Sequence, residues 1–304
     1  MPLYSFNAGL RVTSKRPGNT LVVQAPAKVN LFLEILAKRP DGYHDIATLM
    51  VAVNLFDVLR FKEEKSGDIR LTCSNPELST GPENLVFRAA DLLKRYTGCK
   101  KGVSIRLTKL IPLAAGLAGG SSDAAATCIG LNRLWNLGLS LKELLALGAE
   151  LGSDVSFFFS PPAAWCTGRG EKVKPLSLKK RLWFVLVAMP VGLSTARVYQ
   201  RVQVPLRPET GKEIRRAVRQ GEVKEIGAQL HNRLQATAEK LCPTVRDVRE
   251  RLRKLDPAGV LMSGSGPSVF ALCRNRNEAV RIARQLRHGL KEEASVFLVQ
   301  SCQS

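Results

Sequence analysis

A glycine-rich segment at residues 112–122 has the residue types that can bind a polyphosphate. Glycine and alanine let the backbone approach a bulky anion closely. The alanine-rich run after Asp123 predicts a helix whose N-terminal amides and dipole attract negative charge. The candidate phosphate-binding residues are Pro112, Leu113, Ala114, Ala115, Gly116, Leu117, Ala118, Gly119, Gly120, Ser121 and Ser122.

Two familiar phosphate-binding motifs do not describe this segment. No Gly-Lys-Ser/Thr follows the glycines, as a Walker A loop requires, and the segment does not open a βαβ unit, as a Rossmann fingerprint does. The remaining alternative is a glycine turn that only packs a helix tightly onto a sheet. Other parts of the chain have to decide between these interpretations.

Three shorter patterns also carry polar residues. Lys28 and Asn30 lie two residues apart in an apolar segment, so their side chains point to one face of a strand and need a polar destination. Asp154 stands between the end of a predicted helix and the apolar run 155–159, and residues 262–268 form a second glycine-rich turn. Singly, each has an ordinary alternative: an edge-strand lysine, a turn aspartate and a hairpin loop.

In this order and spacing the four patterns resemble the signature motifs of the GHMP kinases. The resemblance extends over nearly all of the chain from Leu21 onward. Residues 39–44, Arg-Pro-Asp-Gly-Tyr-His, are typical of one branch. That branch uses ATP to phosphorylate the 2-hydroxyl of a cytidine-diphosphate-linked methylerythritol in the non-mevalonate route to isopentenyl diphosphate.

The resemblance implies a role for each matching residue. Lys28 and Asp154 are the expected catalytic pair, and segment 112–122 holds the phosphates of ATP. The expected substrate-binding residues are Asn30, Tyr43, His44 and Tyr199, with Tyr43 and His44 at the cytidine end and Tyr199 against the cytosine. Mg²⁺ is implied by ATP, without an assigned ligand.

The chain departs from the branch within 231–235, His-Asn-Arg-Leu-Gln, where the branch usually has an acidic pair. Arg233 and Gln235 stand in place of those acids. The formal net charge of +20 is a second departure. Such a charge concentrates anions near the protein, but the basic residues are spread along predicted amphipathic helices.

Composition limits the remaining classes. Hydrophobic residues make up 45% of the 304 residues, yet no run is long enough to span a membrane and the first 20 residues lack an apolar signal core. We expect a cytoplasmic protein. Seven cysteines without a Cys-x-x-Cys pair, and three histidines, argue against a disulfide framework and a zinc site.

The pattern of elements predicts an α+β fold with two domains. The predicted strands are 21–24, 29–36, 46–61, 102–107, 155–159, 181–189, 259–262, 269–273 and 295–299, and the predicted helices are 83–96, 121–135, 141–151, 211–219, 223–229, 230–241, 245–255 and 278–290. Residues 1–20 are expected to be a loose extension. The resemblance implies an ATP-binding domain at 21–172 that is similar to domain 2 of ribosomal protein S5, and a ferredoxin-like α/β sandwich domain at 173–304.

Two alternatives stay open. One is a GHMP kinase for another alcohol, such as homoserine, mevalonate or a sugar, which Tyr43 and His44 disfavour. The other is a basic RNA-binding protein, although no aromatic RNA-binding motif is visible. We expect ATP and a small-molecule substrate as partners, no nucleic acid or membrane, and a monomer or homodimer.

Overall fold

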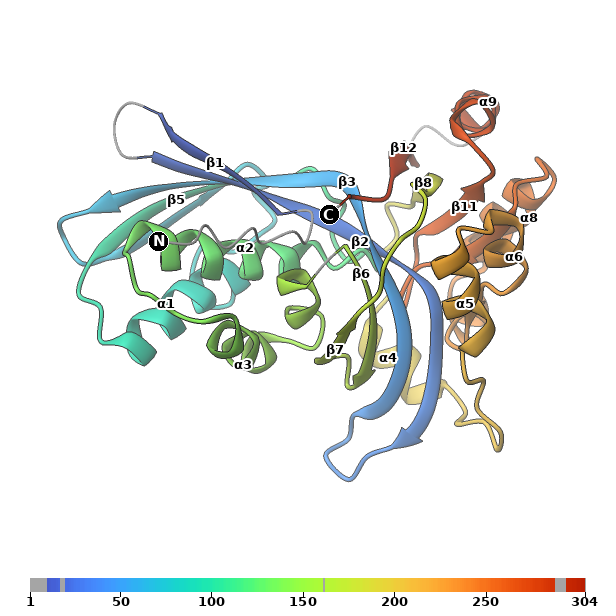
Figure 1. The fold of residues 1–304 in the computed structure, drawn as a ribbon, viewed down its shortest axis with the longest axis horizontal. Helices are drawn as coiled ribbons and strands as arrows, with labels where there is room; N and C mark the ends of the chain where they lie inside the picture. Colours follow the sequence, from blue (N-terminus) through green and yellow to red (C-terminus); the bar gives the residue numbers. More distant parts are fainter. Residues whose placement is uncertain (1–9, 17–19, 161, 288–293, 304) are drawn as a thin grey trace.

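The computed structural model describes residues 10–16, 20–160, 162–287 and 294–303, which form two sheets with helices packed on them (Figure 1). The first sheet has the order β1-β2-β3-β5-β4, with β6 paired to β3, β7 to β6 and β9 to β2. The second sheet has the order β10-β11-β8-β12. The predicted α+β class is confirmed.

The strands are β1 Arg11–Arg16, β2 Thr20–Lys38, β3 His44–Glu64, β4 Ile69–Cys73, β5 Gly102–Thr108, β6 Ala163–Gly168, β7 Lys172–Pro175, β8 Trp183–Ala188, β9 His231–Asn232, β10 Gly259–Met262, β11 Val269–Cys273 and β12 Ser295–Gln300. The α-helices are α1 Leu85–Thr97, α2 Gly119–Leu134, α3 Leu141–Leu151, α4 Thr195–Arg201, α5 Lys212–Gln220, α6 Val223–Ala228, α7 Gln235–Leu241, α8 Pro243–Arg253 and α9 Arg276–Arg287, with a 3₁₀ helix η1 at Ser156–Phe159.

The long antiparallel pair β2 and β3 runs through both halves of the molecule (Figure 1). The sequence suggested two separate strands at 21–24 and 29–36 because Pro26 lies between them. Instead, the strand continues through Pro26, where the pairing of β2 with β3 shifts register. A bulge of this kind accommodates a residue that has no backbone N–H to donate.

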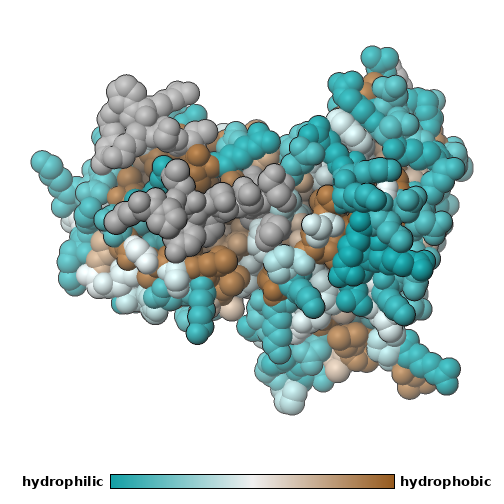
Figure 2. All heavy atoms as spheres, viewed as in Figure 1, coloured by the Kyte–Doolittle hydropathy of each residue, from teal (hydrophilic) through white to brown (hydrophobic). Residues whose placement is uncertain are grey.

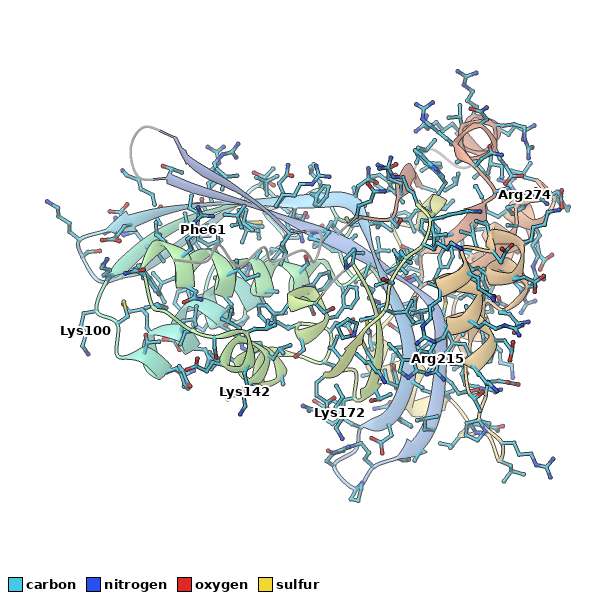
Figure 3. All side chains as sticks on the ribbon, in the orientation of Figure 1. Phe61, Lys100, Lys142, Lys172, Arg215 and Arg274 are labelled. Atoms are coloured by element: carbon cyan, nitrogen blue, oxygen red, sulfur yellow. The ribbon has the colours of Figure 1, made fainter. Side chains whose placement is uncertain are left out.

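Helices α1, α2 and α3 lie together on one side of the first sheet (Figure 1). Phe61 points from β3 toward α2 (Figure 3). A Cβ atom at Gly130 of α2 would stand 2.8 Å from the Phe61 ring. Glycine at this position therefore lets α2 approach the sheet, and this contact helps to fix the helix whose N-terminus adjoins segment 112–122.

The second sheet is buried on both faces, which explains the apolar sequence of β8. Phe184 and Leu186 point toward α5 and α6, whereas Val185 and Val187 pack with residues of α8 and α9. Successive side chains of a strand point to opposite faces, so a strand between two helical layers is apolar at every position.

Several predicted elements were wrong. Residues 11–16 form β1, which pairs with β2, so this part of the expected loose extension is a strand; residues 1–9 and 17–19 lie outside the described residues. Residues 156–159 form η1 and not a strand, because a short buried apolar run does not distinguish the two. The predicted helix 230–241 begins later, at Gln235, since His231 and Asn232 pair with β2.

The predicted domain boundary at 172/173 falls inside β7. Thr167 of β6 pairs with Lys172 of β7, and both strands belong to the first sheet. The second sheet begins at Trp183 of β8. The predicted boundary therefore lies within a strand that belongs to the first sheet.

The positive charge is spread over both domains. Figure 3 shows Lys100 and Lys142 on the first domain and Arg274 on the second. On the face that Figure 2 shows, hydrophilic residues cover most of the surface over α5, α6, α8 and α9. Part of this charge is locally paired.

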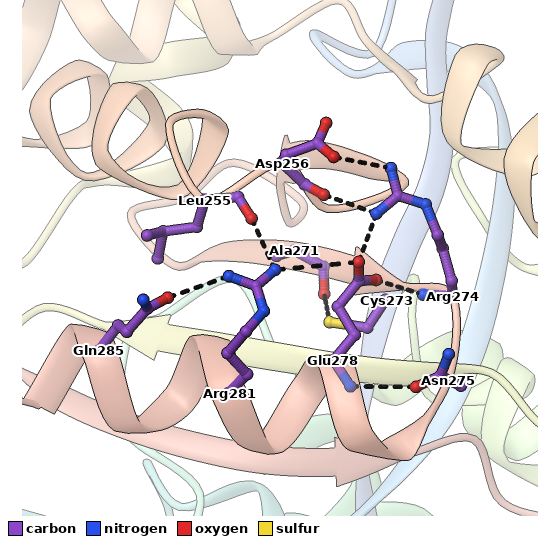
Figure 4. A network of polar contacts seen from close by, with 9 residues as sticks. All are labelled: Leu255, Asp256, Ala271, Cys273, Arg274, Asn275, Glu278, Arg281 and Gln285. Atoms are coloured by element: carbon purple, nitrogen blue, oxygen red, sulfur yellow. Dashed lines mark hydrogen bonds and ion pairs between the residues drawn. The ribbon is translucent and has the colours of Figure 1, made fainter.

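Figure 4 shows one such network at the start of α9. The Arg274 guanidinium pairs with Glu278 and, at 3.2 Å, with Asp256. Arg281 donates to the Leu255 carbonyl at 2.9 Å and to Gln285 at 3.1 Å. These contacts attach α9 to the loop between α8 and β10.

Two further findings bear on the predicted class. In the part of the chain that the structure describes, no helix has the length and apolar character needed to cross a membrane. The seven cysteines are free thiols, and five of them are buried.

Candidate active site

A cavity of about 1200 Å³ opens where the two domains meet. Its lining includes nearly all of the residues predicted from sequence: Lys28, Asn30, Tyr43, His44, Pro112, Leu113, Ala114, Ala115, Gly116, Ala118, Gly119, Gly120, Ser121, Asp154 and Tyr199. Leu117 and Ser122 are the two predicted residues outside the lining, and both are buried. The fold thus brings the separate sequence patterns to one place.

The backbone of residues 112–122, here called the glycine loop, has left-handed conformations at Ala114, Gly116 and Ala118. Left-handed alanines are costly and are held only where the surroundings impose them. Ala118 caps α2 without a side-chain hydrogen bond. In the part of the chain that the structure describes, no side chain caps the first amides of α2, and its N-terminus lines the cavity, as an anion-binding helix end does.

The second glycine turn, residues 262–268, packs directly on the glycine loop. Ser263 Oγ donates to the Gly116 carbonyl at 3.0 Å, and the Ser268 amide donates to the Ala115 carbonyl. A Cβ atom at Gly116 would stand 2.2 Å from the Ser263 carbonyl oxygen. Gly116 is therefore required both for its backbone conformation and for the contact between the two domains.

Lys28 is buried beside the glycine loop and faces Asp154. Its Nζ donates to Asn30 Oδ1 at 2.6 Å and to the Gly116 carbonyl at 2.9 Å, and it lies 3.7 Å from Asp154 Oδ2. Burial lowers the pKa of Lys28, while the Asp154 carboxylate opposes that shift. The Asp154 side chain is 30% exposed, so a carboxylate and an ammonium adjoin the cavity together.

Asn30 holds Lys28 in place. Its Nδ2 donates to Thr48 Oγ1 at 2.8 Å, and Thr48 in turn donates to the Phe32 carbonyl at 2.6 Å. This chain fixes the amide so that its oxygen faces the lysine. The polar destination predicted for Lys28 and Asn30 is thus a shared network on one face of β2.

Three aromatic or imidazole rings also line the cavity. The His44 and Tyr199 rings are 5.5 Å apart between centroids and inclined by 45°. Burial and the nearby Lys38 charge lower the pKa of His44, so the neutral imidazole presents one donor and one acceptor. Tyr43 is 53% exposed. Burial, and then the Asp154 charge, raise the pKa of Tyr199.

A buried ion cluster that the sequence did not reveal lies beneath the glycine loop. Lys109 Nζ pairs with Asp57 and, at 2.8 Å, with Asp123 of α2. Asp57 Oδ1 also accepts from the Leu110 and Ile111 amides. Burial raises the pKa of Asp123, although Lys109 works in the opposite direction. The cluster joins β3, the approach to the loop and α2.

The comparisons identify the family. Models of the GHMP kinases N terminal domain and of the GHMP kinases C terminal match residues 84–160 and 214–292. A 4-diphosphocytidyl-2-C-methyl-D-erythritol kinase of Shouchella clausii is 42% identical over 280 residues, which is 92% of this chain and 94% of that protein. The chain belongs to the family of 4-diphosphocytidyl-2-C-methyl-D-erythritol kinases. The predicted family and the two-domain GHMP kinase fold are therefore confirmed.

Solved structures agree with this assignment. A crystal structure of a 4-(cytidine 5'-diphospho)-2C-methyl-D-erythritol kinase is 35% identical, with a TM-score of 0.76, over 92% of this kinase and 99% of that chain. Homoserine kinase from Cytophaga hutchinsonii has a TM-score of 0.74 at 18% identity, over 96% of this kinase and 98% of that chain. At that identity the second match shows the fold alone.

Arg233 and Gln235, which stand in place of the usual acidic pair, lie outside the cavity lining. Arg233 donates twice to the buried Glu34 carboxylate, at 2.7 Å each, and Gln235 accepts from the Met262 amide at 3.0 Å. The neighbouring Asn232 donates to the Met262 and Gly264 carbonyls. In this kinase the segment therefore supports the second glycine turn and attaches β9 to β2.

Several lining residues were not predicted from the sequence. Lys38, Leu85, Lys109, Arg169, Thr195 and Ser265 also line the cavity. Arg169 stands in the turn between β6 and β7, and Thr195 begins α4. The Gly-Arg-Gly sequence at 168–170 was a usable signal for Arg169, because paired glycines often mark a tight turn.

Proposed function

We propose that this kinase transfers the γ-phosphoryl group of ATP to the 2-hydroxyl of 4-diphosphocytidyl-2-C-methyl-D-erythritol, in the non-mevalonate route to isopentenyl diphosphate. The observation that carries the proposal is the placement of Lys28 and Asp154 between the glycine loop and the rings of His44 and Tyr199. One cavity thus offers places for a polyphosphate, a reacting hydroxyl and a pyrimidine.

Each group has a distinct task in this proposal. Phosphoryl transfer depends mainly on positioning and on stabilising charge. Asp154 accepts the hydroxyl proton, and Lys28 orients Asp154 and offsets charge on the phosphoryl oxygens. Amides of the glycine loop and of the first turn of α2 hold the phosphates.

His44, Tyr199 and Tyr43 bind the cytidine end in this proposal. A neutral His44 can both donate to and accept from the polar edge of cytosine. The Tyr199 ring lies beside the His44 ring. Binding energy at this remote end would orient the hydroxyl that reacts. Asn30 then contributes by fixing Lys28.

Mg²⁺ is the expected metal. Among the described residues, no group of three His, Cys, Asp or Glu side chains could hold a metal ion. Mg²⁺ commonly binds through one or two carboxylates, waters and the phosphates of its substrate, so an ion that accompanies ATP does not need such a group of protein side chains. We propose that the phosphates of ATP would hold most of its coordination sites and that the Ser121 hydroxyl, which lines the cavity, would be its side-chain donor; there it would offset phosphate charge.

Other expectations remain proposals. Free cysteines fit the reducing environment of a cytoplasmic enzyme. A monomer or homodimer that binds no nucleic acid stays a prediction. The spread of the basic residues over both domains supports the second part of this prediction, since a nucleic-acid site needs a basic patch on one face.

An ADP-release assay tests the proposed function. The purified chain should consume ATP with the cytidyl substrate and show little turnover with homoserine or mevalonate. Methylerythritol phosphate without the cytidyl group should have a lower kcat and a higher KM, because the remote binding energy is lost. Efficient turnover of that truncated compound would contradict the assignment of the cytidine end.

A further inference from the structure

The turn between β6 and β7 holds a single arginine in a fixed backbone. Gly168 and Gly170, on either side of Arg169, have φ values of 71° and 123°, which favour glycine. Glu171 folds back over the turn, and its Oε2 accepts from the Arg169 amide at 2.7 Å. Thr167 accepts from the Gly170 amide at 3.1 Å. The position of Arg169 is therefore built into the hairpin.

This turn packs against the loop that carries Asp154. A Cβ atom at Gly170 would stand 3.3 Å from the Ser153 carbonyl oxygen and 3.7 Å from Asp154 Oδ1. The backbone beside Arg169 thus touches the catalytic end of the cavity.

The Arg169 guanidinium lies over the Tyr43 ring, 4.9 Å from its centroid. Tyr43 is itself held by its backbone, because its carbonyl accepts from Arg39 at 2.8 Å and its amide donates to Asp41 at 3.1 Å. A cation over a fixed aromatic face is attracted to it and keeps its N–H edges free. Arg169 thus extends from the Asp154 loop to the cytidine end.

Most of the other charges that line the cavity are already compensated. Lys28 faces Asp154, Lys109 lies between Asp57 and Asp123, and Asp41 is bound by Arg39. Within the described ranges, the Arg169 guanidinium has no ion pair and donates to no side chain. Its charge is one of the weaker causes that lower the pKa of Asp41. Lys38, the remaining cation of the lining, is exposed at the end of β2.

We propose that Arg169 binds the diphosphate of the cytidyl substrate; this inference rests on the proposed function. In that substrate the diphosphate lies between the cytidine and the hydroxyl that reacts, and Arg169 lies between Tyr43 and the Asp154 loop. A planar guanidinium donates two parallel hydrogen bonds to phosphate oxygens. One face of Tyr43 is then occupied by Arg169, so the substrate meets only its other face or its edge.

Arg169→Met tests this assignment, since it keeps the length of the side chain and removes its charge. We expect KM for the cytidyl substrate to rise about 10- to 100-fold, the range for lost hydrogen bonds to a charged group, while KM for ATP changes by less than about twofold. The KM of Arg169→Lys for the cytidyl substrate should lie between those of the wild type and Arg169→Met. Lys172→Met removes the same charge from an exposed position on β7 and should match the wild type.

Two competitive inhibitors, CDP and cytidine, show which part of the substrate Arg169 contacts. The inhibition constant of CDP should rise with KM in Arg169→Met, whereas that of cytidine, which has no phosphate, should stay constant. An unchanged constant for CDP, or an equal rise for cytidine, would overturn the role of Arg169. Absence of turnover by the wild type would instead contradict the proposed function, and calorimetric titration with CDP would still decide the role of Arg169.

Discussion

Lys28 Nζ lies 3.7 Å from Asp154 Oδ2, and the two side chains differ sharply in exposure: 4% for the lysine and 30% for the aspartate. The ammonium is enclosed by protein acceptors on the other sides. It therefore orients the carboxylate toward the cavity without itself being open to solvent. This asymmetry suits a lysine that positions and an aspartate that meets the substrate.

Asp154→Asn should lower kcat by about 10²–10⁴-fold, the usual contribution of a general base. KM for ATP and for the cytidyl substrate should change little, because asparagine keeps the shape and a hydrogen-bonding group. Steady-state ADP release measures all three constants. Asp247→Asn, an exposed change on α8, is the control. Turnover near that of the control would remove Asp154 from the mechanism.

Gly120→Ala should separate phosphate binding from packing. A Cβ atom there meets only Leu85, at 3.5 Å, which is an ordinary contact, so alanine should be tolerated and is the better helix former. Thermal unfolding should therefore occur at the same or a higher temperature, while KM for ATP rises because a methyl group stands where a phosphate approaches.

Gly116→Ala is the contrasting variant, because its backbone is left-handed and a Cβ atom would meet the Ser263 carbonyl at 2.2 Å. It should lose stability as well as activity. If Gly120→Ala bound ATP normally, its glycine would have no part in phosphate binding. At Gly119 the test is ambiguous, since a Cβ atom would crowd Ile111 and Lys109.

The sequence predicted the components of the site better than their surroundings. Lys28, Asn30 and the glycine loop were recognisable because their chemistry is local: alternation along one strand, and glycines before an alanine-rich helix. The Lys109–Asp57–Asp123 cluster was not, because its members come from three distant segments. Nothing local distinguishes a buried lysine that has two carboxylate partners from an exposed one.

The errors in the fold have similar causes. A proline normally ends a strand, but the bulge at Pro26 lets β2 continue. His231 and Asn232 followed a helical pattern, yet tertiary pairing with Phe32 and Leu33 made them a strand. In both cases a long-range contact outweighed local preference, and single-sequence reasoning cannot detect such a contact.

Lys109→Met should lower the free energy of unfolding by about 3–5 kcal/mol, because it leaves buried carboxylates without their cation. Lys101→Met removes a lysine from a surface pair with Glu63 and should cost less than about 1 kcal/mol. Urea unfolding compares the two. Equal losses would show that the buried cluster contributes no more than a surface pair.

Arg233→Ala should show how much Arg233, which stands in place of a usual acidic residue, contributes to the free energy of unfolding. Glu34 is fully buried and accepts from Arg233, His231 and the amides of Ile35 and Glu209. Burial acts to raise the pKa of Glu34, but these hydrogen bonds hold it well below its usual value of 4.5. Removing Arg233 should therefore cost about 3–5 kcal/mol near neutral pH.

The pH dependence identifies the carboxylate responsible. A carboxyl with a lowered pKa stabilises the fold above its unfolded pKa, and this contribution is lost as the pH falls through the folded value. The difference in unfolding free energy between wild type and Arg233→Ala should thus be greatest near neutral pH and shrink below about pH 4.5. Arg216→Ala, which breaks a surface pair with Glu213 that is also 2.7 Å long, should cost less than about 1 kcal/mol and show no such trend. A difference for Arg233→Ala that stayed constant from neutral to acid pH would mean that Arg233 stabilises the fold by packing and not by its charge on Glu34.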